Sequence, residues 1–173
     1  MSKQEGKNKM EEIKIEKVVL SAAGIGDKLE KACKLLKIIS GKKPIKLTSK
    51  RRIPAFNVRP GLETGCKVTI RKDFSILKRL LQAVENSLKI KQIEDNHFSF
   101  GIHEYIEIPE MEYQRDIGTQ GLNVTVSFVK AGKKVKLKKI KRGRYPKKQE
   151  VKKEEIIDFM EKNYKVEFEG KEK

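Results

Sequence analysis

The sequence lacks any long apolar run. No stretch approaches the roughly 18 apolar residues that a membrane-spanning helix needs, and the first ten residues, MSKQEGKNKM, contain no apolar core of a secretory signal. We therefore expect a cytoplasmic protein with no membrane partner. At 173 residues the chain is long enough to bury a real core in one domain, with or without ordered extensions.

Cysteine and histidine are scarce as well. Cys33 and Cys66 are the only cysteines and show no C-x-x-C spacing, which favours reduced structural thiols over a metal or redox role. His97 and His103 lie six residues apart beside Glu104, without a third strong metal ligand. We predict no metal site and no cofactor, and we interpret both histidines as structural or as facing a bound nucleic acid.

Signatures of catalysis are missing too. The segment AAGIGD at residues 22–27 contains only G-x-G, without the further glycine and the lysine of a phosphate-binding loop. Glu104, Glu107 and Glu110 straddle a predicted strand and Pro109, so their carboxylates are not expected to converge as a catalytic pair. The sequence predicts a protein that is not an enzyme.

Acidic residues are absent from one long stretch that is rich in basic ones. Between Glu30 and Glu63 there is no Asp or Glu, whereas there are ten Lys or Arg. Residues 41–72 overlap this stretch and extend beyond it. They contain two short β-type runs, three prolines and one aromatic residue, Phe56. A basic loop held between strands suits a surface that touches phosphates from a fixed position. This pattern favours structured nucleic-acid binding.

A second basic segment follows later. From Lys130 to Lys148 there are eleven Lys or Arg and no acid, and the net charge of the whole chain is +17. Such an excess attracts polyanions, although an anionic membrane surface would attract it too. Gly132, Gly143 and Pro146 interrupt the segment, so a continuous helix is not expected.

The apolar pattern predicts an α+β protein. Strands are expected over residues 13–20, 45–49, 66–70, from 97 into a turn, and 122–129. Helices are expected from Asp27, as N-cap or first-turn acid, to a stop at Gly41, from Asp73 to Leu88, and over residues 150–163. This order fits a two-layer sandwich, a mainly antiparallel sheet with helices on one face, plus a basic C-terminal extension and a terminal helix.

We divide the chain into three parts on this basis. Residues 1–11 are expected to form a tail that is disordered or ordered by RNA, and residues 12–129 an α+β core domain that binds RNA. Residues 130–173 are expected to form the basic extension with the C-terminal helix.

Four motifs follow one another in unbroken order over roughly residues 13–129: IEKVVLSAAGIGDKLEKACKLLKIISGKKP, SKRRIPAFNVRPGLETGCKVTIR, FSFGIHEYIEIPEMEY and DIGTQGLNVTV. Together they resemble the family of large-subunit ribosomal proteins that bind 5S rRNA, the fifth in bacterial and the eleventh in eukaryotic nomenclature. The later segment KRGRYPKKQEVKKEEIIDFMEKNYKVEF resembles the archaeal and eukaryotic C-terminus. The bacterial form opens with an extra helix for which this chain has no room.

The resemblance implies that the sheet face and adjoining loops bind a hairpin arm of 5S rRNA. Carried over residue by residue, the site falls on Ser21, Lys42, Phe56 and Thr69. Ser21 and Lys42 depart from the family, which commonly has Asn and Gln there; Lys42 only donates, so we expect steeper salt dependence of binding. Other expected 5S rRNA contacts, unless they form only a solvated cluster, are Lys43, Lys50, Arg51, Arg52 and Arg71.

The loop at residues 55–64 resembles the one that reaches the elbow of the tRNA in the ribosomal P site. Pro54 and Pro60 restrict its conformations, and Arg59 can meet a phosphate through its guanidinium fork. Because every tRNA must pass, contacts are expected to sugar and phosphate. The expected tRNA contacts are Phe56, Asn57, Arg59, Pro60 and Gly61. The alternative is a surface hairpin whose charge is incidental.

The second basic segment is interpreted as a further rRNA contact, in which Tyr145 can stack on an exposed base. The expected contacts are Lys136, Lys138, Lys139, Lys141, Arg142, Arg144 and Tyr145. The run KLKKIKRGR would also fit a nuclear-localisation signal in a eukaryotic protein, which is compatible with rRNA binding.

The resemblance also implies a role and further partners. The role is that of a structural constituent of the large subunit, ribosome-associated in the cytoplasm, that anchors 5S rRNA in the central protuberance. The partners are large-subunit rRNA, neighbouring central-protuberance proteins and a small-subunit head protein, reached through a bridge near EDNHFSFGIHEY and EMEYQRDIGTQG. Phe98 and Phe100 are expected in the core, with base stacking as the alternative. A non-ribosomal RNA-binding, RNA-annealing or RNA-modifying protein, or a regulatory role outside the ribosome, remains the alternative function.

Overall fold

A six-stranded sheet forms the centre of the structure, a computed structural model that describes residues 10–170. Its strand order is β2-β3-β1-β7-β6-β5, and every neighbouring pair is antiparallel. The strands are β1 (Ile13–Ala23), β2 (Ile45–Thr48), β3 (Glu63–Ile70), β5 (Ile93–Glu94), β6 (His97–Ile102) and β7 (Leu122–Lys130). The predicted α+β class with a mainly antiparallel sheet is confirmed. Residues 1–9 of the predicted tail lie outside the described residues.

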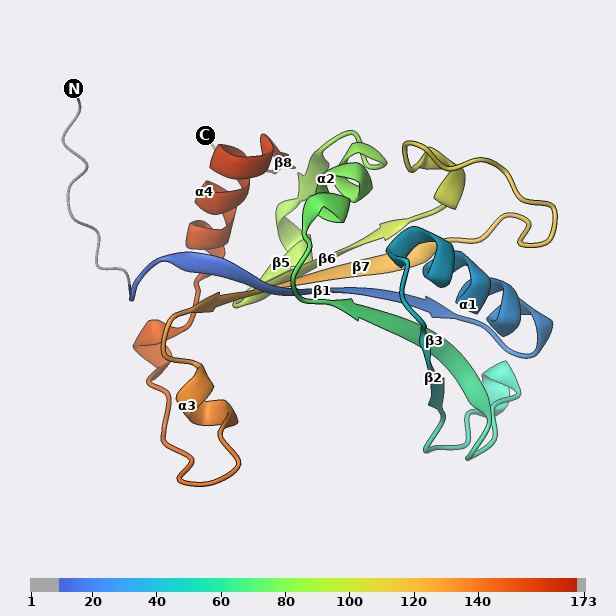
Figure 1. The fold of residues 1–173 in the computed structure, drawn as a ribbon, viewed down its shortest axis with the longest axis horizontal. Coiled ribbons are helices and arrows are strands. Elements are labelled where there is room, and N and C mark those ends of the chain that lie inside the picture. Colours follow the sequence, from blue (N-terminus) through green and yellow to red (C-terminus); the bar gives the residue numbers. More distant parts are fainter. Residues whose placement is uncertain (1–9, 171–173) are drawn as a thin grey trace.

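Three longer helices lie on one side of this sheet, as Figure 1 shows. They are α1 (Asp27–Ser40), α2 (Ser75–Gln82) and α4 (Lys153–Tyr164). On their side, β4 (Ser87–Lys89) and β8 (Glu167–Glu169) form a parallel pair. The four-residue α3 (Lys134–Leu137) lies on the other side, in a long basic loop. Short 3-10 turns are η1 (Pro54–Phe56), η2 (Ile90–Gln92), η3 (Tyr105–Glu107) and η4 (Lys147–Gln149).

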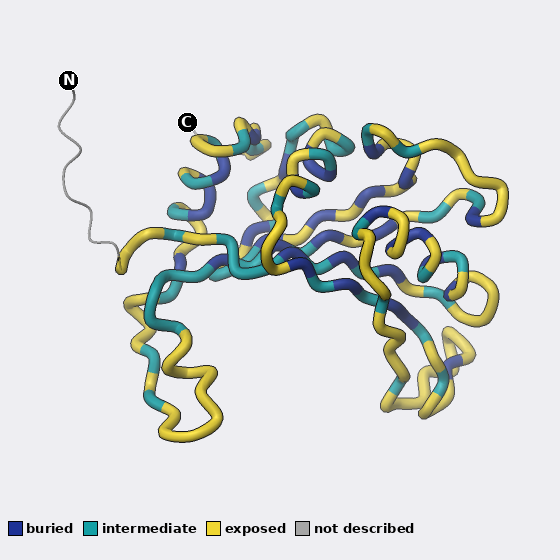
Figure 2. Tube along the Cα trace, viewed as in Figure 1, coloured by how far each residue is buried: buried dark blue, intermediate teal, exposed yellow. Residues whose placement is uncertain are grey.

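The core lies between the sheet and these helices, where buried positions concentrate in Figure 2. Phe98 and Phe100 of β6 are only 1% and 3% exposed, which confirms the core prediction and rules out base stacking by these two rings. Phe128 of β7 stacks on Phe98 with ring centroids 5.8 Å apart. Phe159 of α4 meets Phe128 edge-on at 5.6 Å, so aromatic packing fastens the C-terminal helix to the sheet.

The ends of α1 follow from local chemistry. Asp27 is the first helical residue, where its carboxylate favours the positive end of the helix dipole, and Gly26 occupies the N-cap position. Of the two predicted roles for Asp27, the first-turn acid is therefore correct. Gly41 adopts φ 65° and donates its N–H to the Lys37 carbonyl at 2.9 Å. The predicted stop is confirmed, because this left-handed conformation favours glycine.

The second helix is shorter than the apolar pattern predicts. The expected span from Asp73 to Leu88 is wrong, since the helix begins at Ser75 and ends at Gln82. Glu85 and Asn86 have φ of 53° and 55°, which a right-handed helix does not tolerate. Leu88 stays buried but belongs to β4, where it pairs with Phe168 of β8.

The remaining elements follow the expected order with shifted ends. The first strand extends to Ala23, three residues beyond the prediction. The only α-helix in the basic segment at residues 130–148 is the four-residue α3, so the prediction that the segment forms no continuous helix is confirmed. The predicted terminal helix is α4, and β8 after it was not expected. The division of the chain after residue 129 stays a prediction.

Candidate nucleic-acid interface

The sheet presents an open face on the side opposite to α1, α2 and α4 (Figure 1). Because successive strand residues point to opposite faces, the residues between the buried ones point to it. Two rows of open-face residues cross the sheet, Lys67–Ser21–Asn123–Gly101 and Thr69–Val19–Thr125–Ser99. Apart from Lys67, none of these is charged, so these two rows offer mainly hydroxyl and amide groups for hydrogen bonding. The next row on this face, Lys17–Ser127–His97, adds a second lysine.

Shallow hollows on this open face expose its polar groups. One, of about 260 Å³, is bordered by β1, β6 and β7 and includes Ser21 and Asn123; a second, of about 360 Å³, adds Ser99 and Thr125. Gly101 leaves room beside Asn123, because a Cβ at residue 101 would come within 3.2 Å of the Asn123 Oδ1. The amide of Asn123 is therefore exposed over a glycine, where it can donate and accept.

Ser21 and Thr69 are among the contact residues predicted from the sequence. Three other polar residues of the open face, Asn123, Thr125 and Ser99, are not. The segment LNVTVSFV contained the signal. Its alternate residues, Val124 among them, are buried, so the polar residues between them occupy the open face. The alternation alone shows that these polar residues share one face of the strand. The position of the helices was needed to show that this face is open to a partner.

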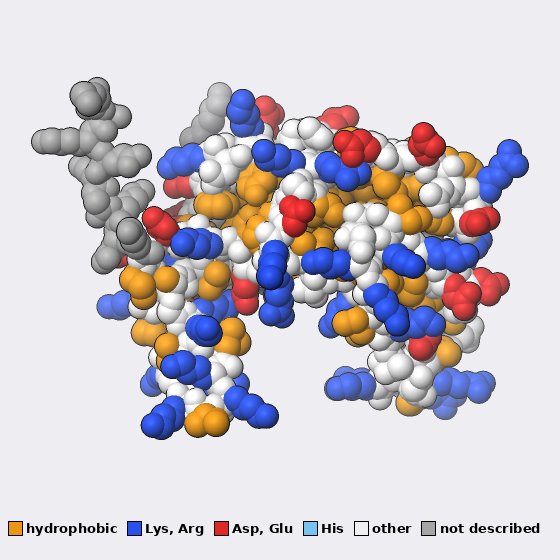
Figure 3. Space-filling view, in the orientation of Figure 1, with side chains coloured by type: hydrophobic (Ala, Val, Ile, Leu, Met, Phe, Trp, Pro, Cys, Tyr) orange, Lys and Arg blue, Asp and Glu red, His pale blue; other side chains and the backbone are white. Residues whose placement is uncertain are grey.

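Two basic projections flank the open face. The first leg, residues 45–63, consists of β2 and the loop that joins it to the start of β3, and the second leg, residues 131–149, follows β7. Both project away from the side of α1, α2 and α4, and Figure 3 shows Lys and Arg side chains on both legs with a hollow between them. The two basic segments, far apart in sequence, thus form one arch around a polar sheet face.

The first leg is held by its own backbone. Ile53 and Val58 exchange two hydrogen bonds, of 2.9 and 3.1 Å, around η1. Gly61, with φ 84°, donates its N–H to the Ser49 carbonyl at 2.8 Å and closes the hairpin. The predicted contact residues on this leg, all exposed, are Lys50, Arg51, Arg52, Phe56, Asn57, Arg59, Pro60 and Gly61. A fixed loop therefore presents these basic groups, as the prolines led us to expect.

Three predicted 5S rRNA residues lie at the edge of this arrangement. Lys42 and Lys43 are exposed in the turn after α1, and Arg71 is exposed directly after β3. The Ser75 N–H and, more weakly, the charge of Lys42 lower the pKa of the Asp73 carboxyl. Lys42 is thus close to the acid that precedes α2.

The second leg is fastened at its root and exposed at its tip. Lys133 pairs with Glu16 of β1, and Lys130 pairs with Glu155 of α4. Tyr145 is half-buried and donates its hydroxyl hydrogen to the Gln149 carbonyl. The predicted basic contact residues on this leg are all exposed, and none has an acidic partner within ion-pair distance among residues 10–170; they are Lys136, Lys138, Lys139, Lys141, Arg142 and Arg144.

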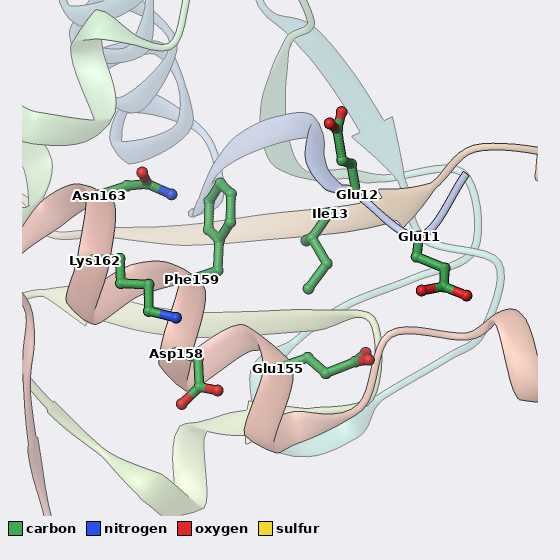
Figure 4. A pocket seen from close by; sticks show the side chains of 8 residues that line it. All are labelled: Glu11, Glu12, Ile13, Glu155, Asp158, Phe159, Lys162 and Asn163. Atoms are coloured by element: carbon green, nitrogen blue, oxygen red, sulfur yellow. The ribbon is translucent and has the colours of Figure 1, made fainter. Parts of the chain in front are cut away.

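An acidic hollow lies elsewhere, between the start of β1 and α4 (Figure 4). It measures about 360 Å³ and is lined by Glu11, Glu12, Glu155 and Asp158 beside apolar side chains and Lys162. Carboxylates repel phosphates, so this hollow does not belong to a nucleic-acid interface.

Features of other site types are absent from residues 10–170. In that range no three His, Cys, Asp or Glu side chains gather as metal ligands. Nor does any helix there have the length and apolar character needed to cross a membrane. The His97 ring instead lies 3.5 Å from Glu94 and 3.3 Å from the Asp95 carbonyl oxygen.

Sequence comparison places the chain in a known family. The family model of ribosomal protein L5 matches residues 8–59, and the model of the C-terminal region of the same ribosomal family matches residues 63–159. The chain belongs to the ribosomal protein L5 family. The two matched regions are separated by residues 60–62, within the first leg. Ribosomal L5 proteins are structural rather than enzymatic, so the prediction that this chain is not an enzyme is confirmed.

Relatives in the L5 family match nearly the whole chain. The large ribosomal subunit protein uL5 of Nanoarchaeum equitans is 41% identical over 162 residues, covering 91% of this chain and 96% of the relative. The uL5 proteins of Pyrobaculum aerophilum and Methanoculleus marisnigri are 39% and 37% identical, and cover 88% and 91% of this chain and 88% and 98% of their own lengths. These archaeal relatives agree with the archaeal or eukaryotic variant predicted from the C-terminal segment.

Proposed function

We propose that the chain is a structural constituent of the large ribosomal subunit that binds 5S rRNA and anchors it in the central protuberance. The observation that carries this proposal is the arch, a polar open face between two basic legs. Paired RNA presents a wide, shallow minor groove lined with 2′-hydroxyls and bordered by phosphates. Hydroxyl and amide side chains of the open face suit the groove, and the legs suit the phosphates on its borders.

The residues divide into two roles under this proposal. Ser21, Thr69 and Asn123 make hydrogen bonds on the open face. Phosphate contacts come from the exposed basic residues of the two legs: Lys50, Arg51, Arg52, Lys136, Lys138, Lys139, Lys141, Arg142 and Arg144. At the edge of the interface, Lys42, Lys43 and Arg71 add further phosphate contacts. The second leg also reaches large-subunit rRNA, where Tyr145 stacks only if a base approaches its exposed edge.

The tip of the first leg contacts P-site tRNA in this proposal. Phe56, Asn57, Arg59, Pro60 and Gly61 are all exposed there, and the backbone bonds below them fix their position. A fixed basic loop can meet the sugar and phosphate of any tRNA without reading its sequence.

One segment of the surface is acidic, in contrast to the two basic legs, and this supports a protein partner there. In the segment of residues 104–116, which includes the exposed Tyr113, the exposed acids are Glu104, Glu107, Glu110, Glu112 and Asp116. An acidic surface with an exposed aromatic suits a basic protein, and we assign it to the bridge with the small-subunit head. Neighbouring central-protuberance proteins and a ribosome-associated, cytoplasmic location complete the proposal.

Binding to isolated 5S rRNA tests the main claim. The purified chain is titrated against archaeal 5S rRNA and against an unrelated hairpin RNA of equal length at several salt concentrations. We expect tighter binding to 5S rRNA at every salt concentration, with strong salt dependence for both RNAs. Equal affinity for the two RNAs would leave only a generic basic RNA-binding protein.

A further inference from the structure

The two cysteines of the chain meet between α1 and β3, which pack on each other. Cys66 of β3 is only 1% exposed, and the partly buried Cys33 packs against the same core from α1. The two thiols share a hydrogen bond, although they lie far apart in the sequence. The spacing of the cysteines favoured separate structural thiols, whereas the fold brings them into contact. Close approach of two cysteine side chains is the first requirement for a disulfide.

The surroundings of the two thiols differ. Burial and, secondarily, the hydrogen bond and charge of Cys33 raise the pKa of the Cys66 thiol, so Cys66 keeps its proton. Cys33 is the thiol that reaches solvent. An oxidant dissolved in water therefore meets Cys33 first and Cys66 only through Cys33.

A lysine lies near the more accessible thiol. Lys46 of β2 is opposite Cys66 in the strand register, so both side chains project to the face that α1 covers. The hydrogen bond and charge of Glu63 raise the pKa of the Lys46 ammonium most, and the charge of Cys33 contributes to the same rise. Reactive cysteines are typically partly exposed and close to a cation, and Cys33 has both properties.

We propose that Cys33 and Cys66 form a peroxide-sensitive dithiol site, in which Cys33 is oxidised first and Cys66 closes a disulfide that ties α1 to β3. The site lies apart from the proposed RNA interface. Cys66 points to the helix side, whereas its neighbours Gly65 and Lys67 point to the open face. The inference therefore goes beyond the proposed function and does not depend on it.

The reaction balances with hydrogen peroxide as the oxidant. The Cys33 sulfur attacks one peroxide oxygen, the O–O bond breaks, and the leaving hydroxide takes the thiol proton and becomes water. The Cys66 sulfur then attacks the sulfur of the Cys33 sulfenic acid. The S–O bond breaks, and the leaving hydroxide takes the Cys66 proton as a second water. Each sulfur loses one electron, and the peroxide gains both.

The role of Cys66 in this site is to make the oxidation reversible. A sulfenic acid without a partner thiol is oxidised further to a sulfinic acid, which thiol reductants do not restore. A disulfide is opened again by thiol exchange. Disulfides in reducing compartments are usually transient and redox-sensing, and a site that closes only under peroxide fits that pattern.

Mass spectrometry of the full chain tests the proposal. The folded protein is treated with hydrogen peroxide, catalase removes the excess, and free thiols are alkylated in urea before digestion. We expect a monomer that has lost two hydrogens, a cross-linked peptide pair that contains Cys33 and Cys66, and recovery of both thiols with dithiothreitol.

Two variants separate the roles of the thiols. In Cys66→Ala, Cys33 should gain two oxygen atoms as a sulfinic acid that dithiothreitol does not remove. Circular dichroism checks folding, and Cys66→Val replaces Cys66→Ala if the latter unfolds. The matched control combines Cys33→Ala with Ile38→Cys, which moves the second thiol to an exposed position of the same helix. This control should form no disulfide with Cys66.

Three results would overturn the proposal. One is a natural chain in which peroxide converts Cys33 to a sulfinic acid while Cys66 stays a free thiol. Another is a disulfide that joins Cys33 of two chains instead of Cys33 and Cys66 of one. The last is equally fast pairing in the control, which would show that the fold does not select the partner. None of these results bears on 5S rRNA binding, so the proposed function stands or falls separately.

Discussion

Lys133 Nζ lies 2.7 Å from Oε2 of Glu16, an ion pair that joins the second leg to β1 across 117 residues of sequence. Lys130, at the end of β7, makes a 2.6 Å contact with Glu155 of α4. Both lysines have a carboxylate partner within the protein. The basic segment at residues 130–148 therefore combines lysines that fix the leg with exposed ones that are available to phosphates.

Lys136→Ala and Lys133→Ala should consequently differ in their effects on RNA binding. If Lys136 contacts a phosphate, its loss reduces the slope of log affinity against log salt by about 0.7 to 0.9. Lys133→Ala should change this slope less, and it should lower the free energy of unfolding because Glu16 loses its partner. Salt titrations of 5S rRNA binding and urea unfolding measure the two quantities. Equal slope changes in both variants would contradict the division between root and tip.

The Lys130–Glu155 pair predicts a pH dependence of stability. Burial alone raises the pKa of the Glu155 carboxyl, but the hydrogen bonds from Lys130 and from the Lys152 N–H, with the charges of both lysines, bring the pKa below its ordinary value. The pair therefore stabilises the fold fully above the unfolded-state pKa of about 4.3, and this stabilisation is lost as pH falls through the lower folded-state pKa.

Glu155→Gln tests this dependence by urea unfolding. At neutral pH the variant should be less stable by about 0.5 to 1 kcal/mol, because Glu155 is partly exposed and the pair is screened by solvent. Below both pKa values the difference should shrink. Asp158→Gln, at the same acidic hollow but without an ion pair among the described residues, is a suitable control. A difference that grows in acid would contradict the assignment.

The charges of the first leg should act through phosphate contacts. Combined substitution of Lys50, Arg51 and Arg52 by Ala should reduce the salt slope of 5S rRNA binding by about 2 to 3 if each contacts a phosphate. Removing three exposed lysines from the helix side of the sheet, Lys28, Lys34 and Lys37, controls for net charge. Gel-shift titrations compare the two, with folding checked by circular dichroism. Similar losses in both variants would indicate a general charge effect.

Asn123 predicts a different signature, because an amide contact displaces no counterions. Asn123→Ala should lower 5S rRNA affinity about two- to tenfold at every salt concentration, with an unchanged slope. Asn163→Ala on α4, at the acidic hollow, is the control and should leave affinity unchanged. Fluorescence anisotropy of labelled 5S rRNA provides the affinities. Wild-type affinity in Asn123→Ala would remove this residue from the interface.

Local chemistry made much of this fold predictable, and non-local pairing limited the rest. The ends of α1 follow from Asp27 and Gly41, whose effects act within one turn. The fate of Leu88 depends on Phe168, 80 residues away, so the apolar spacing alone suggested a helix that is too long. Likewise, the composition of each leg was enough to predict a basic, RNA-binding segment. That both legs project from the same face of the sheet depends on the strand order, which the composition does not show. Asn123 became a candidate only when the covered face was known.

The buried thiol of Cys66 should resist alkylation in the folded protein. Burial and, secondarily, the hydrogen bond and charge of Cys33 on α1 raise the pKa of Cys66 to about 12. Because the thiolate is the nucleophile, iodoacetamide near pH 8 should modify Cys66 on the order of a thousandfold more slowly than in the unfolded chain. Mass spectrometry of digested protein, with and without urea, measures the rates, and Cys33→Ala isolates the single thiol. Rapid labelling of Cys66 under native conditions would show that α1 does not cover β3 in solution.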